Sequence, residues 1–362
     1  MPPFPSFASW DITPSTFSQL LKLYPTTLRE SHKQRLLARD VRKHRKHPER
    51  LIQNNPTYAK QADALLELDS WRYNTLPQVL RDRAAQATDS SSNQNKNEVL
   101  KADEKYDGMF LHKEEAIKLL DWKLQRGRFR PQLPGMLKTN KPIVIRKASA
   151  DAFKALVDKQ PSLDAIDETY PKDSLDMLTG PIRAVGPALA SLILALATEG
   201  KANEIPFYSD ELFLWLCVDS FPISEKNRRN YEKATRLIRK DGSGLNLKYN
   251  MHEYRQLYEE VVKFRQRLNG EVREADETAR LFTTADVERV AYVIQHLGVS
   301  GFPDAAEILR LDEESKKATR EEAEGDDEAE EMILGVTTSK PSKPGKRKGD
   351  WNQKGKTKKK KI

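Results

Sequence analysis

Helical periodicity restricts this chain more than any other property of its sequence. Apolar residues recur every three or four positions through long stretches, and sustained alternation of apolar and polar residues is scarce. One such stretch carries Tyr254, Leu257, Val261, Phe264 and Leu268. Because spacings of three and four place side chains on one face of an α-helix, the sequence predicts an all-α fold. Asn269 and Gly270 are expected to end this helix.

Short signals place several helix ends. In "KEEAIKLLDWKLQRG" an amphipathic pattern stops at Gly127, and Thr283 with Asp286 forms a capping box before "VERVAYVIQHLG". Ser209 is a good N-cap for the helix that begins "DELF". Between these helices, "RFRPQLPGMLKTN" is broken by proline and glycine, so we expect an irregular connection there.

Composition divides the chain into regions. The segment "QATDSSSNQNKNE", which begins at residue 86, has no capacity to form a core. Acidic residues dominate 312–331 and lysines dominate 340–361, and neither segment can bury apolar surface. The expected organisation is a basic helical N-terminal region at 1–85, a polar linker at 86–105, a helical domain at 106–300 and a disordered tail at 311–362, first acidic and then basic.

Charge and composition bear on partners and cofactors. The net charge is +8, and the block "KPGKRK" in the lysine-rich tail is typical of a nuclear localisation signal or a nucleic-acid-binding arm, with a solvated tail as the alternative. No apolar run reaches the roughly 18 to 20 residues of a membrane span. The single cysteine, Cys217, cannot form an internal disulfide or an iron–sulfur site, and the six histidines are scattered. We therefore expect a nuclear protein with no membrane partner, no metal site and no cofactor.

Residues 174–197 combine two helical segments with a tight turn. The segment "SLDMLTGPI" predicts a short helix, "RAVGP" a turn, and residues 188–197 a helix that contains no breaker. This order is a helix-hairpin-helix. The backbone N–H groups of Val185, Gly186 and Ala188, with a helix N-terminus behind them, can bind a DNA phosphate without reading bases.

The hairpin and the segment after it resemble a known family. "IRAVGPALA" and the following "PFYSDELFLWL" are similar to the hairpin and trailing aspartate of the helix-hairpin-helix DNA glycosylase superfamily, the relatives of endonuclease III and adenine glycosylase. "WKLQRGRFRP", residues 122–131, is similar to a segment of an uncharacterised eukaryotic group of this type. The resemblance covers residues 106–270 and implies a glycosylase-like helical domain that binds DNA.

The resemblance also implies roles for individual residues. Asp210 corresponds to the aspartate that stabilises positive charge on the sugar while the bond to a base breaks. Phe207 and Tyr208 are candidates to line a pocket for that base, which must first leave the stack. Separately from the resemblance, basic residues interleaved with aromatic ones favour phosphate contact at Lys123, Arg126, Arg128 and Arg130.

Departures from the family pattern define the expected activity. Ala184 replaces the first hairpin glycine, and Ala188 lies where bifunctional members have a nucleophilic lysine, so Schiff-base chemistry is not expected from that position. The sequence therefore favours a nuclear DNA-binding protein that acts as a monofunctional DNA N-glycosylase in base excision repair. Two alternatives stay open. One is a non-catalytic nucleic-acid-binding or chromatin-associated scaffold, in which Asp210 only begins a helix, and the other is an RNA-binding or ribosome-assembly factor.

Overall fold

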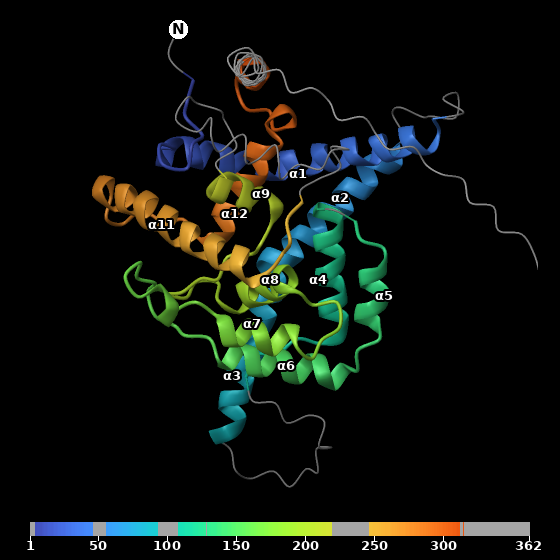
Figure 1. Cartoon of the computed structure of the whole chain (residues 1–362), viewed down its shortest axis with the longest axis vertical. Helices are drawn as coiled ribbons and strands as arrows, with labels where there is room; N and C mark the ends of the chain where they lie inside the picture. The colour runs from blue at the N-terminus through green and yellow to red at the C-terminus, as the bar shows by residue number, and fades with distance from the viewer. Residues whose placement is uncertain are drawn as a thin grey trace, which may run out of the picture. The chain divides into compact units, whose positions relative to one another are not determined.

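The computed structural model describes residues 4–45, 56–92, 108–127, 129–218, 246–311 and 314, all within one compact unit, Met1–Lys316. Every regular element in these ranges is a helix, as the all-α prediction requires (Figure 1). The α-helices are α1 (Pro14–Lys43), α2 (Pro56–Ser70), α3 (Leu76–Ser92), α4 (Lys113–Arg126), α5 (Gln132–Lys138), α6 (Pro142–Lys154), α7 (Lys172–Thr179), α8 (Pro187–Ala197), α9 (Asp210–Phe213), α11 (Met251–Ala275) and α12 (Thr284–Gln295). Short π-helical segments are η2 (Trp71–Thr75) and η4 (Leu214–Val218), and 3₁₀ turns are η3 (Ile166–Glu168) and η5 (Leu297–Val299). Most of the linker expected at 86–105 and nearly all of the tail expected at 311–362 lie outside the described residues.

Helix α8 forms the centre of the fold. Its side chains are apolar on nearly all sides, and Leu189, Leu192 and Leu194 are at most 4% exposed. A helix that is apolar all round is stable only when other elements surround it. Helices α3, α6, α7 and α11 accordingly pack around α8 (Figure 1). The two helices expected on either side of the turn at 180–186 are therefore present as α7 and α8.

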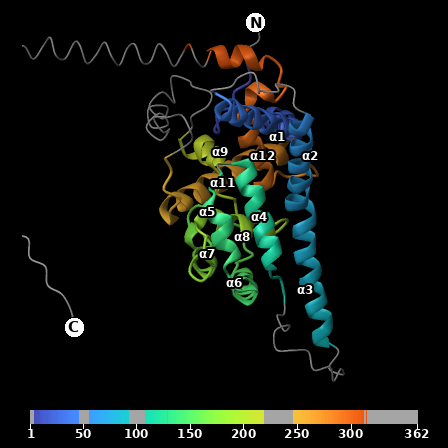
Figure 2. The ribbon, with the colours of Figure 1, turned by 90° about the vertical axis from the view of Figure 1, so that its right-hand side faces the viewer.

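The N-terminal helices belong to the same core. Helix α1 packs against α2 and α12, and its Phe17 and Leu28 are fully buried. The hydroxyl oxygens of Ser31 and Tyr292 lie 2.7 Å apart and link α1 to α12. Helix α2, η2 and α3 follow one another along one edge of the molecule (Figure 2). The described residues of 1–85 thus pack in the same compact unit as the later helices.

A buried cluster of charges joins η2, α4 and α12. Glu288 of α12 accepts a hydrogen bond from Arg72 of η2 at 3.0 Å and another from Arg126 of α4, and these side chains are at most 4% exposed. Nearby, the buried Asp69 carboxylate accepts the indole N–H of Trp122 at 2.9 Å. Because an unpaired ion in a core costs several kcal/mol, the cluster holds these elements in one arrangement.

Two local expectations are wrong. Helix α11 continues through Asn269 and Gly270 to Ala275, because the Asn269 side chain binds the backbone of Phe282 instead of ending the helix, with bonds of 2.8 and 3.0 Å. The segment expected to be an irregular connection contains α5. Its Pro134 lies in the first turn, where a helix tolerates proline because that N–H has no partner within the helix.

Candidate functional site

One buried side chain fixes the turn between α7 and α8. Asn140 accepts the N–H of Arg183 at 2.9 Å and donates to the Arg183 carbonyl oxygen at 3.1 Å. The same amide donates to the Leu137 carbonyl oxygen at 2.8 Å. A turn held from both sides loses little conformational freedom when it binds a partner, so the hairpin is preorganised.

Two of the three expected phosphate donors have no hydrogen-bond partner at this turn. The N–H groups of Gly186 and Ala188 have no hydrogen-bond partner among the described residues. The N–H of Val185 donates to the Ile182 carbonyl oxygen at 3.2 Å, so it is not free for a phosphate. Ala184 has a φ of 71°, the left-handed conformation that favours glycine, and the turn therefore has a glycine-type geometry although glycine is absent.

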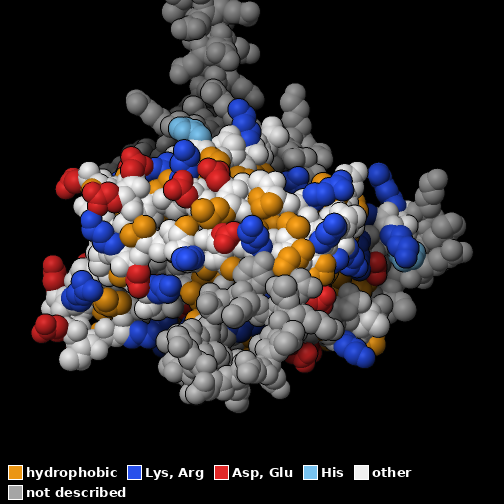
Figure 3. All heavy atoms as spheres, turned by 90° about the horizontal axis from the view of Figure 1, so that it is seen from below, with side chains coloured by type: hydrophobic (Ala, Val, Ile, Leu, Met, Phe, Trp, Pro, Cys, Tyr) orange, Lys and Arg blue, Asp and Glu red, His pale blue; other side chains and the backbone are white. Residues whose placement is uncertain are grey.

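Exposed cations lie close to the hairpin. Lys138 and Lys141 flank Asn140 in the chain, and Arg183 is the residue that Asn140 holds. None of the three cations has an ion-pair partner within the described ranges. On the face seen in Figure 3, Lys and Arg side chains are spread among hydrophobic and acidic ones. The three unpaired cations beside the hairpin are the ones that can attract a phosphate through charge.

The four cations singled out in the sequence have different surroundings. Arg130 is exposed. Arg126 is 3% exposed and bonds to Glu288, so it cannot reach a phosphate, and the expectation for it is wrong. Lys123 is half-buried, and its ammonium group interacts electrostatically with Asp210. Arg128 lies outside the described residues.

Asp210 is the first residue of α9 but does not cap it. The cap is Ser209, whose hydroxyl oxygen accepts the N–H of Leu212 at 3.1 Å. Asp210 instead accepts the hydroxyl of Tyr249 at 2.7 Å. This hydrogen bond joins residues 39 positions apart in the sequence. An acidic residue that only begins a helix does not require such a contact.

The carboxylate site comprises Asp210, Glu211, Tyr249, Lys123 and Arg130. The pKa of Asp210 is raised by burial and by the neighbouring Glu211. The Tyr249 hydrogen bond and the two cations oppose this shift without cancelling it. Burial lowers the pKa of Lys123, and the negative charge of Asp210 partly opposes this shift. No described residue forms a hydrogen bond or ion pair with the Lys123 ammonium group.

The backbone and packing at Tyr249 add to this picture. Tyr249 has a φ of 53°, in the left-handed region that a bulky residue rarely adopts. The guanidinium of Arg130 lies 5.2 Å from the centre of its ring. Perturbed titratable groups and local backbone strain both occur preferentially at functional sites, and the carboxylate site has both.

The two residues expected to line a base pocket lie in the core. Phe207 is 6% exposed and its ring centre is 5.8 Å from that of Trp122. Tyr208 is 1% exposed, its hydroxyl donates to Glu253 at 2.8 Å, and its N–H donates to the Ser191 hydroxyl at 3.0 Å. The structure therefore places both rings away from any described cavity, contrary to the expectation.

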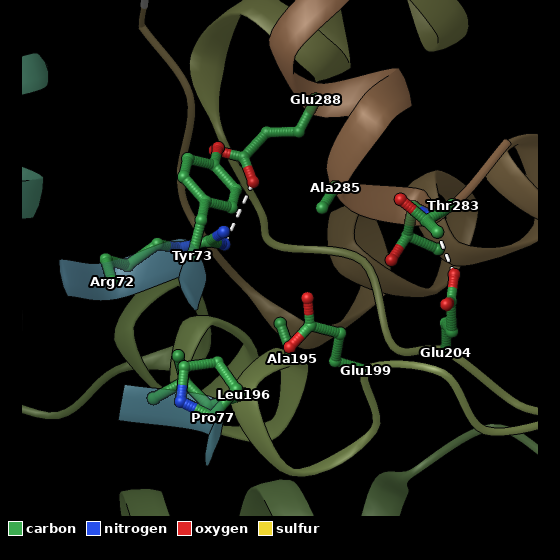
Figure 4. Close-up of a pocket in the computed structure, with 11 residues that line it drawn as sticks. Arg72, Tyr73, Pro77, Ala195, Leu196, Glu199, Glu204, Thr283, Ala285 and Glu288 are labelled. Carbon is green, nitrogen blue, oxygen red and sulfur yellow. Dashed lines mark hydrogen bonds and ion pairs between the residues drawn. The ribbon is translucent and has the colours of Figure 1, made fainter. Parts of the chain in front are cut away.

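A polar cavity beside η2 is the other candidate site (Figure 4). Each of its carboxylates is paired: Glu199 with Arg81, Glu204 with Arg265, and Glu288 with Arg72. Its volume of about 20 Å³ has room for a single water molecule. No group of three metal-ligating side chains occurs in the described part of the chain. The cavity is therefore a small gap in the core rather than a ligand site.

Sequence reasoning missed Asn140 and Tyr249. Each contacts its partner across about forty residues, 43 for Asn140 and 39 for Tyr249. Neither residue belongs to a motif, so only the folded structure brings them to the hairpin and to Asp210.

Comparison with models of protein families, with curated proteins and with solved structures finds no match for this chain. Among the helices in the described ranges, none has both the length and the apolar character that crossing a membrane requires. The hairpin and the carboxylate site are thus the features from which function can be inferred.

Proposed function

We propose that this chain is a nuclear DNA-binding protein with a helix-hairpin-helix glycosylase-like fold, acting as a monofunctional DNA N-glycosylase. The proposal rests on one observation, which is that the helix after the hairpin begins with the carboxylate of Asp210. This carboxylate accepts a hydrogen bond from Tyr249 and interacts electrostatically with the half-buried Lys123. The hairpin supports binding to the DNA backbone, since the unpaired N–H groups at the start of α8 suit a phosphate oxygen.

In the proposed reaction Asp210 acts on the sugar. Breaking the bond between C1′ and the base builds positive charge on the sugar, and a preorganised carboxylate stabilises that charge by about 3 kcal/mol. The Tyr249 hydroxyl binds one carboxylate oxygen and orients the group. Water adds its hydroxide to C1′ and its proton goes to the departing base, so the products are a free base and an intact abasic site.

A binding protein without chemistry is the second candidate. Phe207 and Tyr208 are buried, and Asp210 lines neither the cavity beside η2 nor the one between α1 and α11. Under this candidate the hairpin and its cations bind nucleic acid or chromatin, while the bond between Asp210 and Tyr249 stabilises the fold.

Base release separates the two candidates. Asp210→Asn retains the size of the side chain, and Asp173→Asn is a matched control because Asp173 is an exposed acid in the first turn of α7. We expect Asp210→Asn to lower the release of free base from damaged duplexes by about 100-fold or more, with DNA affinity unchanged and the control fully active. A wild-type protein that binds DNA but releases no base from any duplex would favour the binding protein.

Borohydride trapping tests the monofunctional assignment. Because the position of the family's lysine is Ala188, we expect no covalent adduct between the protein and damaged DNA. An adduct would contradict the assignment, and its loss in Lys123→Met would identify Lys123 as the amine.

Gly186 tests the hairpin. A Cβ added there meets no atom within 4 Å, and φ is −108°, so aspartate and asparagine both fit and both cap α8. Gly186→Asp places a negative charge where the phosphate is expected. We expect its affinity for duplex DNA, measured by fluorescence anisotropy, to be about tenfold below that of Gly186→Asn. Affinities of both variants equal to that of the wild type would contradict a phosphate at this turn.

A further inference from the structure

The loop after α4 holds an aromatic side chain in solvent. Phe129 is 66% exposed, more than any other large hydrophobic side chain among the described residues. Single exposed hydrophobic residues are common on protein surfaces, so exposure alone does not indicate a binding site. The anchoring of the loop and the charges around it distinguish Phe129 from the other exposed residues.

Contacts on both sides of Phe129 anchor this loop. Arg35 of α1 donates to the Gly127 carbonyl oxygen at 3.3 Å and also to the Arg126 carbonyl oxygen. Beyond Phe129, the guanidinium of Arg130 lies over the Tyr249 ring. Gly127 and Arg130, on either side of Phe129, therefore each contact another element of the fold.

Cations continue from this loop along the end of α1. Arg39 lies one helical turn, about 5.4 Å, beyond Arg35. Arg42 and Lys43 follow; both are exposed, and neither has an ion-pair partner in the described part of the chain. Arg39, Arg42 and Lys43 lie four, seven and eight residues after Arg35, which places them on the side of α1 that contacts this loop. Arg39 pairs with Asp40 at 4.0 Å.

We infer that Phe129 stacks on an unpaired base of a DNA strand whose phosphates lie on Arg130 and on the basic end of α1. This inference rests on the proposed DNA binding and specifies the form of DNA that the surface takes. Aromatic rings beside cations are the means by which proteins bind single strands, because each base offers a flat face and each nucleotide a phosphate. In an intact duplex those faces are covered by neighbouring bases, so Phe129 adds affinity only where bases are unpaired.

The test compares two labelled duplexes of equal length, one fully paired and one with an internal bulge of unpaired adenines, binding to the full-length protein. Phe129→Ala is expected to weaken binding to the bulged duplex about tenfold and to leave the paired duplex within about twofold. Phe129→Trp should retain the preference for the bulge. Trp10→Ala is the matched control, since Trp10 is a 45% exposed aromatic residue outside this loop, and it should change neither affinity.

Each other outcome overturns a defined claim. An equal loss on both duplexes would show that the ring makes a general contact and would refute stacking on an unpaired base. No loss on either duplex, with wild-type binding intact, would remove Phe129 from the DNA interface and leave a protein as the occupant of this surface, while the proposed DNA binding would stand. If the wild type bound neither duplex, the proposed function would fail, and this inference with it.

Discussion

Replacing Glu288 with glutamine should be severely destabilising although it only replaces one carboxylate oxygen with an amide NH2 group. Glu288 is the shared anionic partner of Arg72 and Arg126, and these side chains are at most 4% exposed. Removing one partner of a buried ion pair costs about 3–5 kcal/mol because a charge is left uncompensated. Two guanidinium groups lose their partner here while the nearby Asp69 carboxylate remains, so we expect a loss of about 4 kcal/mol. Folded domains have only about 5–15 kcal/mol of stability in total.

Equilibrium unfolding in urea, followed by circular dichroism, measures this loss. The control is Glu307→Gln, which removes a carboxylate from the exposed pair that Glu307 forms with Arg310 and should leave the midpoint unchanged. Equal midpoints for Glu288→Gln and Glu307→Gln would refute the reasoning, because they would show that the buried charges are not coupled to the stability of the fold.

Two further predictions concern stability. Ala184→Gly should raise the free energy of unfolding by about 0.5–1 kcal/mol, since the left-handed conformation costs alanine more than glycine loses in chain entropy; a less stable variant would contradict the assigned φ of 71°. Burial, with the charge of Arg35, lowers the pKa of His32 from 6.5 to about 4, so its neutral form stabilises the fold above pH 6.5 and that stability is lost as the pH falls toward 4. His32→Gln should therefore make the free energy of unfolding fall less steeply with decreasing pH over this window. Part of the pH dependence should remain, because the pKa of His296 is also lowered. An unchanged pH dependence would refute the role of His32.

Local signals predicted local structure. Gly127 ends α4, Thr283 and Asp286 form their capping box, and Ser209 caps α9, as expected. Each of these features depends on residues within about four positions of one another, so the sequence contains all the information needed. Asn269 shows the limit, because its bond to the Phe282 backbone overrides a dipeptide that otherwise stops helices.

The surroundings of the candidate site depended on contacts that the sequence does not show. Basic residues among aromatic ones suggested phosphate binding, yet Arg126 lies four residues after the buried Trp122 and therefore on the same face of α4. That spacing was the available signal that Arg126 points inward. Nothing similar marked Tyr249, whose bond to Asp210 exists only after distant parts of the chain have met.

The pairing of α1 with α12 sets an order of events on the ribosome. Ser31 and Tyr292 are 261 residues apart. At about 5–20 residues per second, synthesis takes roughly 15–50 seconds to pass from one to the other. During that interval α2 can cover part of α1, but the side that meets α12 has no partner and is open to chaperones. Although α1 is made before the other helices in the described ranges, its packing is completed only when α12 has been made.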